Sequence, residues 1–183
     1  IIDKNNNIKE FFQKTSDDNS KLIRSFKSLK KLKFIEFPKL GFKELKKIIN
    51  KIIHLKGCIL LIDYGYLKSH NNNTLQSVMK HKKNNILDNL GKADVTSHVN
   101  FELLTEFFSN NNLKVKSVVS QKKFLENLGI VHRAEILAKK IKFREQSNLY
   151  LRLRRLLNPR MMGDLFKVIC AHNLKKSDFI GFN

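Results

Sequence analysis

Apolar and polar positions follow two different periods along this chain. Between Phe42 and Ile53, apolar residues recur at steps of three and four, which predicts an amphipathic helix. A different pattern follows between Gly57 and Gly65, where five consecutive apolar residues precede an acid and an aromatic residue. A short apolar run bounded by glycines predicts a fully buried strand over 58–63. A helix, a tight turn and a buried strand in this order are half of a βαβ unit.

Further elements follow the same two periods. Residues 67–97 are polar and predict a long connection with at most local structure, whereas Asn100 can cap a helix whose apolar face includes Phe101 and Phe108. The patterns then predict a strand at 114–119, a helix at 121–128, two helices within 131–157, and a last strand at 165–171. This alternation predicts an α/β sheet with a helical insert before the last strand. We expect an insertion or linker at 1–37, one domain at 38–174 and a polar tail at 175–183.

Composition limits the classes of protein. A chain of 183 residues with 42% hydrophobic content can form one ordinary core, and no run approaches the ~20 apolar residues of a membrane span. The start at Ile1 has no initiator Met and no signal-peptide pattern, so we expect part of a longer chain. The net charge of +20 would suit nucleic acid, but it comes from lysine pairs scattered among asparagine-rich segments, which favours a compositional origin. Cys58 and Cys170 are expected to be reduced and buried.

The strand at 58–63 carries the first candidate chemistry. Ligands of parallel α/β sheets bind where the carboxyl ends of strands open into loops. Asp63 stands at that end, followed by Tyr64, Gly65 and Tyr66. A carboxylate beside two phenols can hold a guanidinium by charge-assisted hydrogen bonds and by cation–π contact. The alternative is structural: the acid ends a strand, the glycine permits a turn and the tyrosines pack under the long connection.

A second candidate group precedes the predicted helix at Asn100. Asp94, Thr96 and His98 alternate there, and His98 is a candidate general base. All three residue types also occur routinely in turns before helices, so a structural reading stays open. The other histidines show no metal-ligand spacing, and we predict no metal site.

Several motifs taken together carry a family resemblance. Their order is Ile62-Asp-Tyr-Gly65, Thr74-Leu-Gln76, Ala93-Asp-Val-Thr-Ser-His-Val-Asn-Phe101, Gln121 to Ile130 and Met162-Gly-Asp-Leu-Phe-Lys-Val168. This series resembles the MidA family of S-adenosylmethionine-dependent methyltransferases, which includes the mitochondrial complex I assembly arginine methyltransferase. No single block would suffice, but all blocks occur in order over roughly the C-terminal two thirds of the chain.

The resemblance implies a fold, an activity and partners. It implies the C-terminal part of a class I, Rossmann-like methyltransferase sheet, with 165–171 as an antiparallel last strand. It implies a protein arginine N-methyltransferase that uses S-adenosyl-L-methionine, in the bacterial cytoplasm or the mitochondrion. Asp63 and His98 would be catalytic, and Tyr64, Gly65, Tyr66 and Asp94 would bind the substrate. The glycine-rich cofactor loop of the family does not occur in this sequence, so the cofactor site is expected upstream of residue 1, and the chain alone is expected to be inactive.

Two other classes of function stay open. A basic nucleic-acid-binding module without catalysis would rest on the net charge and on Arg152, Arg154 and Arg155. A non-catalytic, partly folded fragment is the third reading. The expected partner is a protein with an arginine acceptor, with no membrane and with nucleic acid disfavoured, whereas the oligomeric state stays open.

Overall fold

A computed structural model describes residues 10–175 and 178–183. Contacts divide the chain into two compact units. The smaller unit contains residues 10–37 and 70–98, and the larger unit contains residues 38–69 and 99–183. The chain therefore passes between the units after Phe37, Ser69 and His98.

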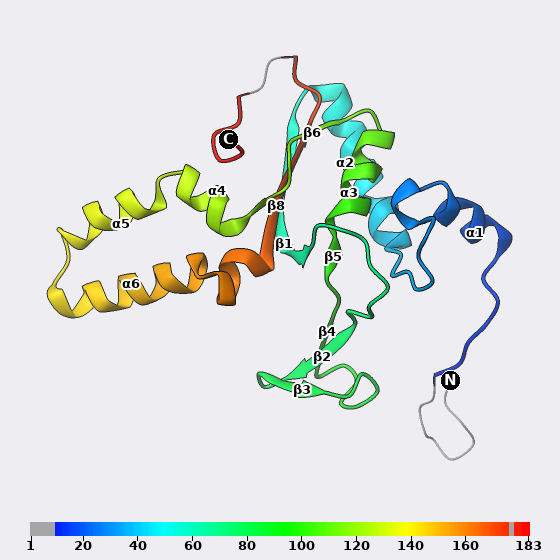
Figure 1. The fold of residues 1–183 in the computed structure, drawn as a ribbon, viewed down its shortest axis with the longest axis horizontal. Coiled ribbons are helices and arrows are strands. Elements are labelled where there is room, and N and C mark those ends of the chain that lie inside the picture. Colours follow the sequence, from blue (N-terminus) through cyan, green and yellow to red (C-terminus); the bar gives the residue numbers. More distant parts are fainter. Residues whose placement is uncertain (1–9, 176–177) are drawn as a thin grey trace. The chain divides into compact units, whose positions relative to one another are not determined.

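The larger unit is built on a mixed sheet in which the last strand lies in the middle. Its path runs β5 (Val99–Asn100), β1 (Cys58–Tyr66), β8 (Phe166–His172) and β6 (Lys114–Val115), and β7 (Val119–Ser120) also pairs with β8. β8 is antiparallel to β1, β6 and β7, whereas β5 is parallel to β1 (Figure 1). The predicted α/β class and the antiparallel last strand are thus confirmed.

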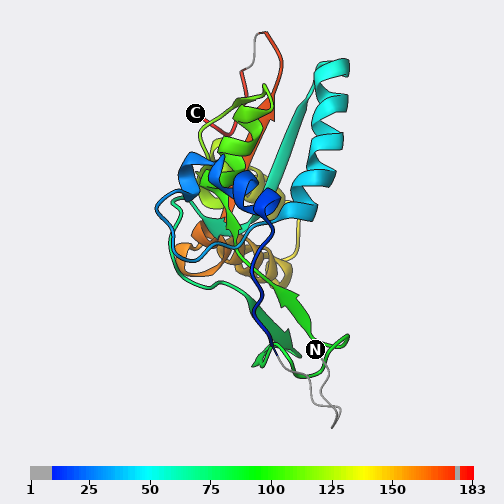
Figure 2. The ribbon, with the colours of Figure 1, turned by 90° about the vertical axis from the view of Figure 1, so that its right-hand side faces the viewer.

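Helices flank this sheet on both sides (Figure 1). α2 (Lys39–Leu55) and α3 (Phe101–Asn110) meet through Phe42 and Phe107, whose rings stack with centroids 3.9 Å apart. Figure 2 shows α2 running alongside β1. On the other side, Val168 of β8 packs with Val119 and with Phe124 of α4 (Gln121–Asn127). α5 (Ile130–Ala138), α6 (Phe143–Leu157) and the irregular helix η2 (Pro159–Gly163) complete the predicted helical insert before β8.

The smaller unit corrects the expectation for the polar connection. Residues within 67–97 form a three-stranded antiparallel sheet of β2 (Gln76–Met79), β3 (Lys82–Asn84) and β4 (Asp94–Thr96), with β2 in the middle. The β2–β3 hairpin turns at Lys80 and His81, whose φ angles are +49° and +64°. Such two-residue turns need positive φ at both positions and usually carry Asn-Gly, so a Lys-His turn gave no signal in the sequence. α1 (Asp17–Arg24) and the short helix η1 (Lys27–Leu29) belong to the same unit.

Four further details of the larger unit differ from expectation. β1 extends three residues beyond 63, to Tyr66, because Gly65 and Tyr66 pair with β5. The predicted strand at 114–119 is two short strands, β6 and β7. β1 is also not fully buried, since Leu60 and Ile62 are 47% and 46% exposed. Cys58 is likewise exposed, whereas Cys170 is buried as predicted.

Candidate functional site

Asp63 lies within β1, three residues before its end. Its side chain is exposed, and Oδ1 accepts a hydrogen bond from the Tyr64 backbone N–H at 2.8 Å. A carboxylate offers about four lone-pair positions, so this bond orients the group and leaves capacity for a guanidinium donor. Tyr64 is half-buried, and its ring meets Phe166 of β8 edge to face at 5.7 Å. Because Asp63 and Tyr64 are consecutive residues of β1, their side chains leave opposite faces of the sheet, and the Tyr64 ring packs on Phe166 on the face away from the carboxylate.

Gly65 is required by the close approach of β5. A Cβ atom at this position would lie 2.1 Å from the backbone oxygen of Val99 and 2.9 Å from Cε2 of Phe101. Contacts that short do not occur between real atoms, so any side chain here would separate the two strands. Asn100, next to Val99, caps α3 by accepting the Leu103 N–H at 3.1 Å. The glycine thus lets the end of β1 join the start of α3.

Lys167 is a charged residue near Asp63 that the sequence analysis did not single out. The register of β1 and β8 places it directly opposite Asp63, so the two side chains leave the same face of the sheet. Its ammonium donates to the backbone oxygen of Asp164. Burial lowers the pKa of Lys167, and the charge of Asp164 opposes that shift. The only signal in the sequence was its place in the last family motif.

His98 and Asp94 lie in the smaller unit. The His98 backbone N–H donates to Oγ1 of Thr74 at 3.0 Å, and the Thr74 hydroxyl donates to Glu36 Oε2 at 2.5 Å. Glu36 Oε1 also accepts the backbone N–H groups of Thr74 and Leu75, both at 3.0 Å. Glu36 therefore anchors the Thr-Leu-Gln motif and, through it, the backbone of His98. Glu36 gave no signal in the sequence, because residues 1–37 show no clear period.

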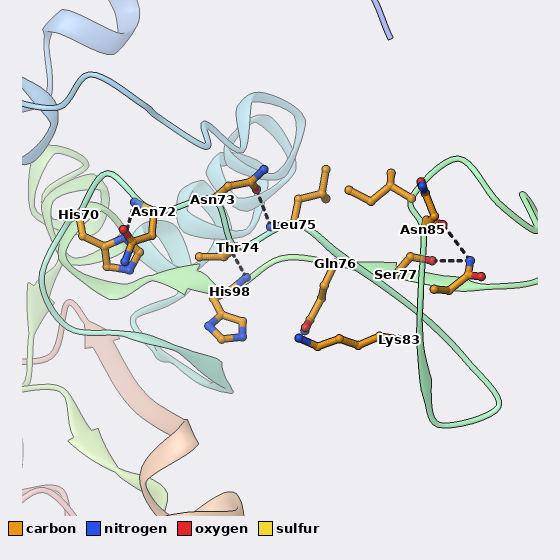
Figure 3. Close-up of a pocket in the computed structure, with 12 residues that line it drawn as sticks. His70, Asn72, Asn73, Thr74, Leu75, Gln76, Ser77, Lys83, Asn85 and His98 are labelled. Atoms are coloured by element: carbon orange, nitrogen blue, oxygen red, sulfur yellow. Dashed lines mark hydrogen bonds between the residues drawn. The ribbon is translucent and has the colours of Figure 1, made fainter. Parts of the chain in front are cut away.

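A cavity of about 650 Å³ opens beside His98 (Figure 3). Strand register explains which groups meet there. Gln76 pairs with Thr96, and Val78 lies between Lys83 on one side and Asp94 on the other, so these five side chains share one face of the small sheet. Gln76, Lys83 and His98 line the cavity, whereas Asp94 and Thr96 do not. In Figure 3 the Gln76, Lys83 and His98 side chains extend to the same side of β2.

The predicted site residues therefore fall into two groups. Asp63, Tyr64, Gly65 and Tyr66 lie together on β1 in the larger unit, and Asp94 and His98 lie in the smaller unit. A single site formed by Asp63 and His98 stays a prediction. Within the described ranges 10–175 and 178–183, no cluster of three or more His, Cys, Asp or Glu side chains is arranged to hold a metal ion, and no helix is long and apolar enough to cross a membrane.

Solved structures share the fold of this chain. A protein from Burkholderia thailandensis, solved with S-adenosyl-homocysteine bound, superposes with a TM-score of 0.63 at 21% identity over 76% of this chain and 38% of that protein. A native structure from the same organism gives the same TM-score over 75% of this chain and 39% of that protein. The sheet, with its last strand inserted antiparallel between β1 and β6, thus belongs to a fold that these two structures share.

Sequence comparison then gives the family. The family model described as "Putative S-adenosyl-L-methionine-dependent methyltransferase" matches residues 2–119, and the chain belongs to this family. The mitochondrial protein arginine methyltransferase NDUFAF7 homolog of Caenorhabditis elegans is 31% identical over 66% of this chain and 27% of its own length. The mitochondrial protein arginine methyltransferase NDUFAF7 of Xenopus tropicalis is 30% identical over 67% of this chain and 28% of its own length. The chain thus spans less than a third of the length of these relatives.

Proposed function

We propose that the protein is a protein-arginine N-methyltransferase that uses S-adenosyl-L-methionine, and that this chain contributes the residues that bind the arginine acceptor. The observation that carries the proposal is an exposed carboxylate, Asp63, oriented by the backbone N–H of Tyr64 on a strand of a chain that belongs to a methyltransferase family. The name of the relatives from C. elegans and X. tropicalis, protein arginine methyltransferase, supports arginine as the acceptor. The same names support a mitochondrial location.

The residues of β1 suit an arginine acceptor by charge and shape. The Asp63 carboxylate would accept N–H groups of the guanidinium, and an ion pair of this type fixes the plane of the group as well as its position. Because methyl transfer is an in-line displacement, holding the acceptor nitrogen in line with the sulfonium methyl would supply much of the acceleration.

Proton balance assigns a role to a base. The donor supplies an electrophilic methyl group: a new N–CH₃ bond forms, the S–CH₃ bond breaks and neutral S-adenosylhomocysteine leaves. The methylated nitrogen must then lose one proton. His98 is our candidate to accept it, since an imidazole can take up a proton near neutral pH. Its backbone is held through Thr74 and Glu36.

Transfer of a labelled methyl group tests this proposal. The full-length protein that carries these residues is incubated with tritiated S-adenosylmethionine and mitochondrial protein, and the labelled product is hydrolysed and analysed for methylarginine. Asp63→Asn keeps the shape of the side chain but removes its charge, so the rate should fall by at least about tenfold. Asp88→Asn is the matched control, because Asp88 is also exposed but lies in the smaller unit.

Three results would contradict the proposal. Label in nucleic acid would overturn the protein substrate, and label on residues other than arginine would overturn the acceptor. Equal rates for Asp63→Asn and Asp88→Asn would remove Asp63 from the site. Nucleic-acid binding is the alternative function, favoured by the exposed Arg152, Arg154 and Arg155 of α6; it predicts binding to duplex DNA that weakens steeply with salt, in the absence of any methyl transfer.

A further inference from the structure

The cavity of the smaller unit has a lining of one charge sign. Its twelve lining residues include one lysine and two histidines, and none is an aspartate or a glutamate. The remaining polar residues are amides and hydroxyls, and two side chains are aliphatic (Figure 3). The lining residues are His70, Asn72, Asn73, Thr74, Leu75, Gln76, Ser77, Lys83, Asn84, Asn85, Ile86 and His98.

Local hydrogen bonds use several acceptor atoms of this lining. Asn73 Oδ1 accepts the Leu75 N–H at 2.9 Å, and Asn85 Oδ1 accepts the Leu87 N–H at 3.1 Å. His70 Nδ1 accepts the Asn72 N–H at 3.2 Å, so its other ring nitrogen, Nε2, carries the hydrogen and is a donor. Other bonds use donors of the lining: the Asn84 amide donates to Ser77 Oγ and to the backbone oxygens of Asn85 and Asp88, and the Thr74 hydroxyl donates to Glu36. The Lys83 ammonium and the amide N–H groups of Asn73 and Asn85 are the donors that can meet an anion.

The positive charge of Lys83 determines which ligand charge the cavity would bind. Its position on β3, opposite Val78, puts its side chain on the same face as Gln76. A single ammonium among neutral donors matches one negative charge, as on a carboxylate. Leu75 and Ile86 add aliphatic surface to the same cavity. A ligand that combines one carboxylate with a short apolar arm would use both kinds of wall.

Two carboxylates near the cavity oppose an anion, and neither of them lines it. The Glu36 carboxylate keeps its charge, but its oxygens are directed at three donors of Thr74 and Leu75. Asp94 shares the face of Lys83 but lies two strands away, which is about 10 Å between backbones. Charges that far apart in water are largely screened at physiological ionic strength. Lys83 is the charged side chain that actually lines the cavity.

We propose that this cavity binds a carboxylate carried on a short aliphatic arm, such as a glutamate side chain, with Lys83 as its counter-ion. The net charge of +20 favours encounter with acidic partners. If the proposed function holds, on which this last step rests, the carboxylate belongs to the protein substrate, and the enzyme selects arginines that have acidic neighbours. The ligand chemistry itself depends only on the cavity.

Titration of the full chain, labelled with ¹⁵N and followed by NMR, tests the site without any methyl donor. The probe is N-acetyl-glutamate amide, with N-acetyl-glutamine amide as the neutral analogue. We expect shifts at His70, Gln76 and His98 with a Kd of about 1 mM, and much smaller shifts with the neutral analogue. Lys83→Met should raise the Kd about tenfold, because it removes a charge-assisted contact.

Lys82→Met is the matched control, since Lys82 is the adjacent residue of β3, is exposed like Lys83 and does not line the cavity. It should change the Kd by no more than about twofold, and Asp94→Asn should lower the Kd by a similar factor. Equal losses in the two lysine variants, or equal shifts with the two probes, would overturn the proposal. Because no methyl transfer is measured, that failure would leave the proposed enzyme activity intact.

A second pair of probes distinguishes the two sources of the carboxylate. A pentapeptide with one central glutamate represents a protein segment, and glutarate represents a free metabolite. Tighter binding of the peptide assigns the site to a protein ligand, whereas tighter binding of glutarate assigns it to a small molecule. Either order supports a carboxylate site, and shifts that map to the larger unit for both probes would contradict it.

Discussion

The packing of Gly65 against β5 gives the sharpest test of the larger unit. In Gly65→Ala, the new Cβ would lie 2.1 Å from Val99 O and 2.9 Å from both the Val99 carbonyl carbon and Phe101 Cε2. The nearest atom belongs to the backbone, so it cannot turn away as the end of a flexible side chain would. The two strands must separate instead, or Phe101, which is 1% exposed, must leave its place in the core.

The cost can be estimated from these contacts. Overpacking a filled site typically costs 1–3 kcal/mol, roughly, and each lost backbone hydrogen bond between β1 and β5 adds about 1 kcal/mol. We therefore expect Gly65→Ala to lower the free energy of unfolding by about 3 kcal/mol. Backbone strain adds nothing to this figure, because the φ angle of Gly65 lies outside the left-handed region.

Gly57→Ala is the matched control, since no atom lies within 4 Å of a Cβ placed at Gly57, directly before β1. It should be neutral or stabilising by up to about 1 kcal/mol, because alanine restricts the unfolded chain more than glycine does. Urea unfolding followed by far-UV circular dichroism measures both variants. If Gly65→Ala is as stable as Gly57→Ala to within about 0.5 kcal/mol, the close pairing of β1 with β5 is wrong.

Three further predictions concern single side chains of the larger unit. Cys170 is 2% exposed, and its pKa is raised to about 11, chiefly by burial and to a smaller extent by the neighbouring Cys58. A thiol reagent should therefore modify only Cys58 in the native chain and both cysteines after denaturation. Rapid reaction of Cys170 in the native chain would contradict its burial. Burial lowers the pKa of Lys167 in the folded state, so the folded chain binds fewer protons than the unfolded chain between the two pKa values, and the free energy of unfolding should rise with pH there. Lys167→Met should therefore be more stable than the parent below that window, by less than about 1 kcal/mol, and the difference should shrink as the pH rises through the lowered pKa. A difference that stays constant with pH would refute the assignment. Leu60 is 47% exposed on a strand whose edge at Cys58–Asp63 pairs with no further strand in the described residues. Because an unpaired strand edge favours self-association, Leu60→Lys should reduce association in sedimentation velocity with little loss of stability. Unchanged association would show that chains do not pair through this edge.

Periodicity predicted those parts of the fold whose burial is one-sided and regular. α2 and α3 bury one face each, and their apolar residues recur at helical spacing, so both helices were found. The apolar character of β1 predicted a strand but not its exposure, because a run of apolar residues looks the same whether both faces are covered or only one. Exposure at Leu60 and Ile62 depends on what packs over them, which the local sequence does not encode.

The smaller unit could not be predicted for a different reason. β2, β3 and β4 have polar faces, and their pairing is held mainly by backbone hydrogen bonds and by a turn of unusual composition at Lys80 and His81. Glu36 and Thr74 are nearly forty positions apart in the sequence, and no local pattern predicts a hydrogen bond between them. The candidate residues around His98 stood out in the sequence by their alternation before a predicted helix and by their place in a family motif. Their arrangement into a cavity needed the structure.

The hydrogen bonds of Glu36 explain why motifs that lie far apart would depend on one another. Thr74 uses its hydroxyl both to donate to Glu36 and to accept the backbone N–H of His98, so one side chain joins three segments. Removing Glu36 would leave the Thr74 hydroxyl and the Thr74 backbone N–H without their acceptor, at a cost of about 1–3 kcal/mol for each group that stays buried, whereas the Leu75 N–H would keep Asn73 Oδ1. The segment at His98 would then lose its fixed position beside Gln76 and Lys83. A residue outside every recognised motif thus holds the histidine segment in place, and the chemistry proposed for this unit depends on it.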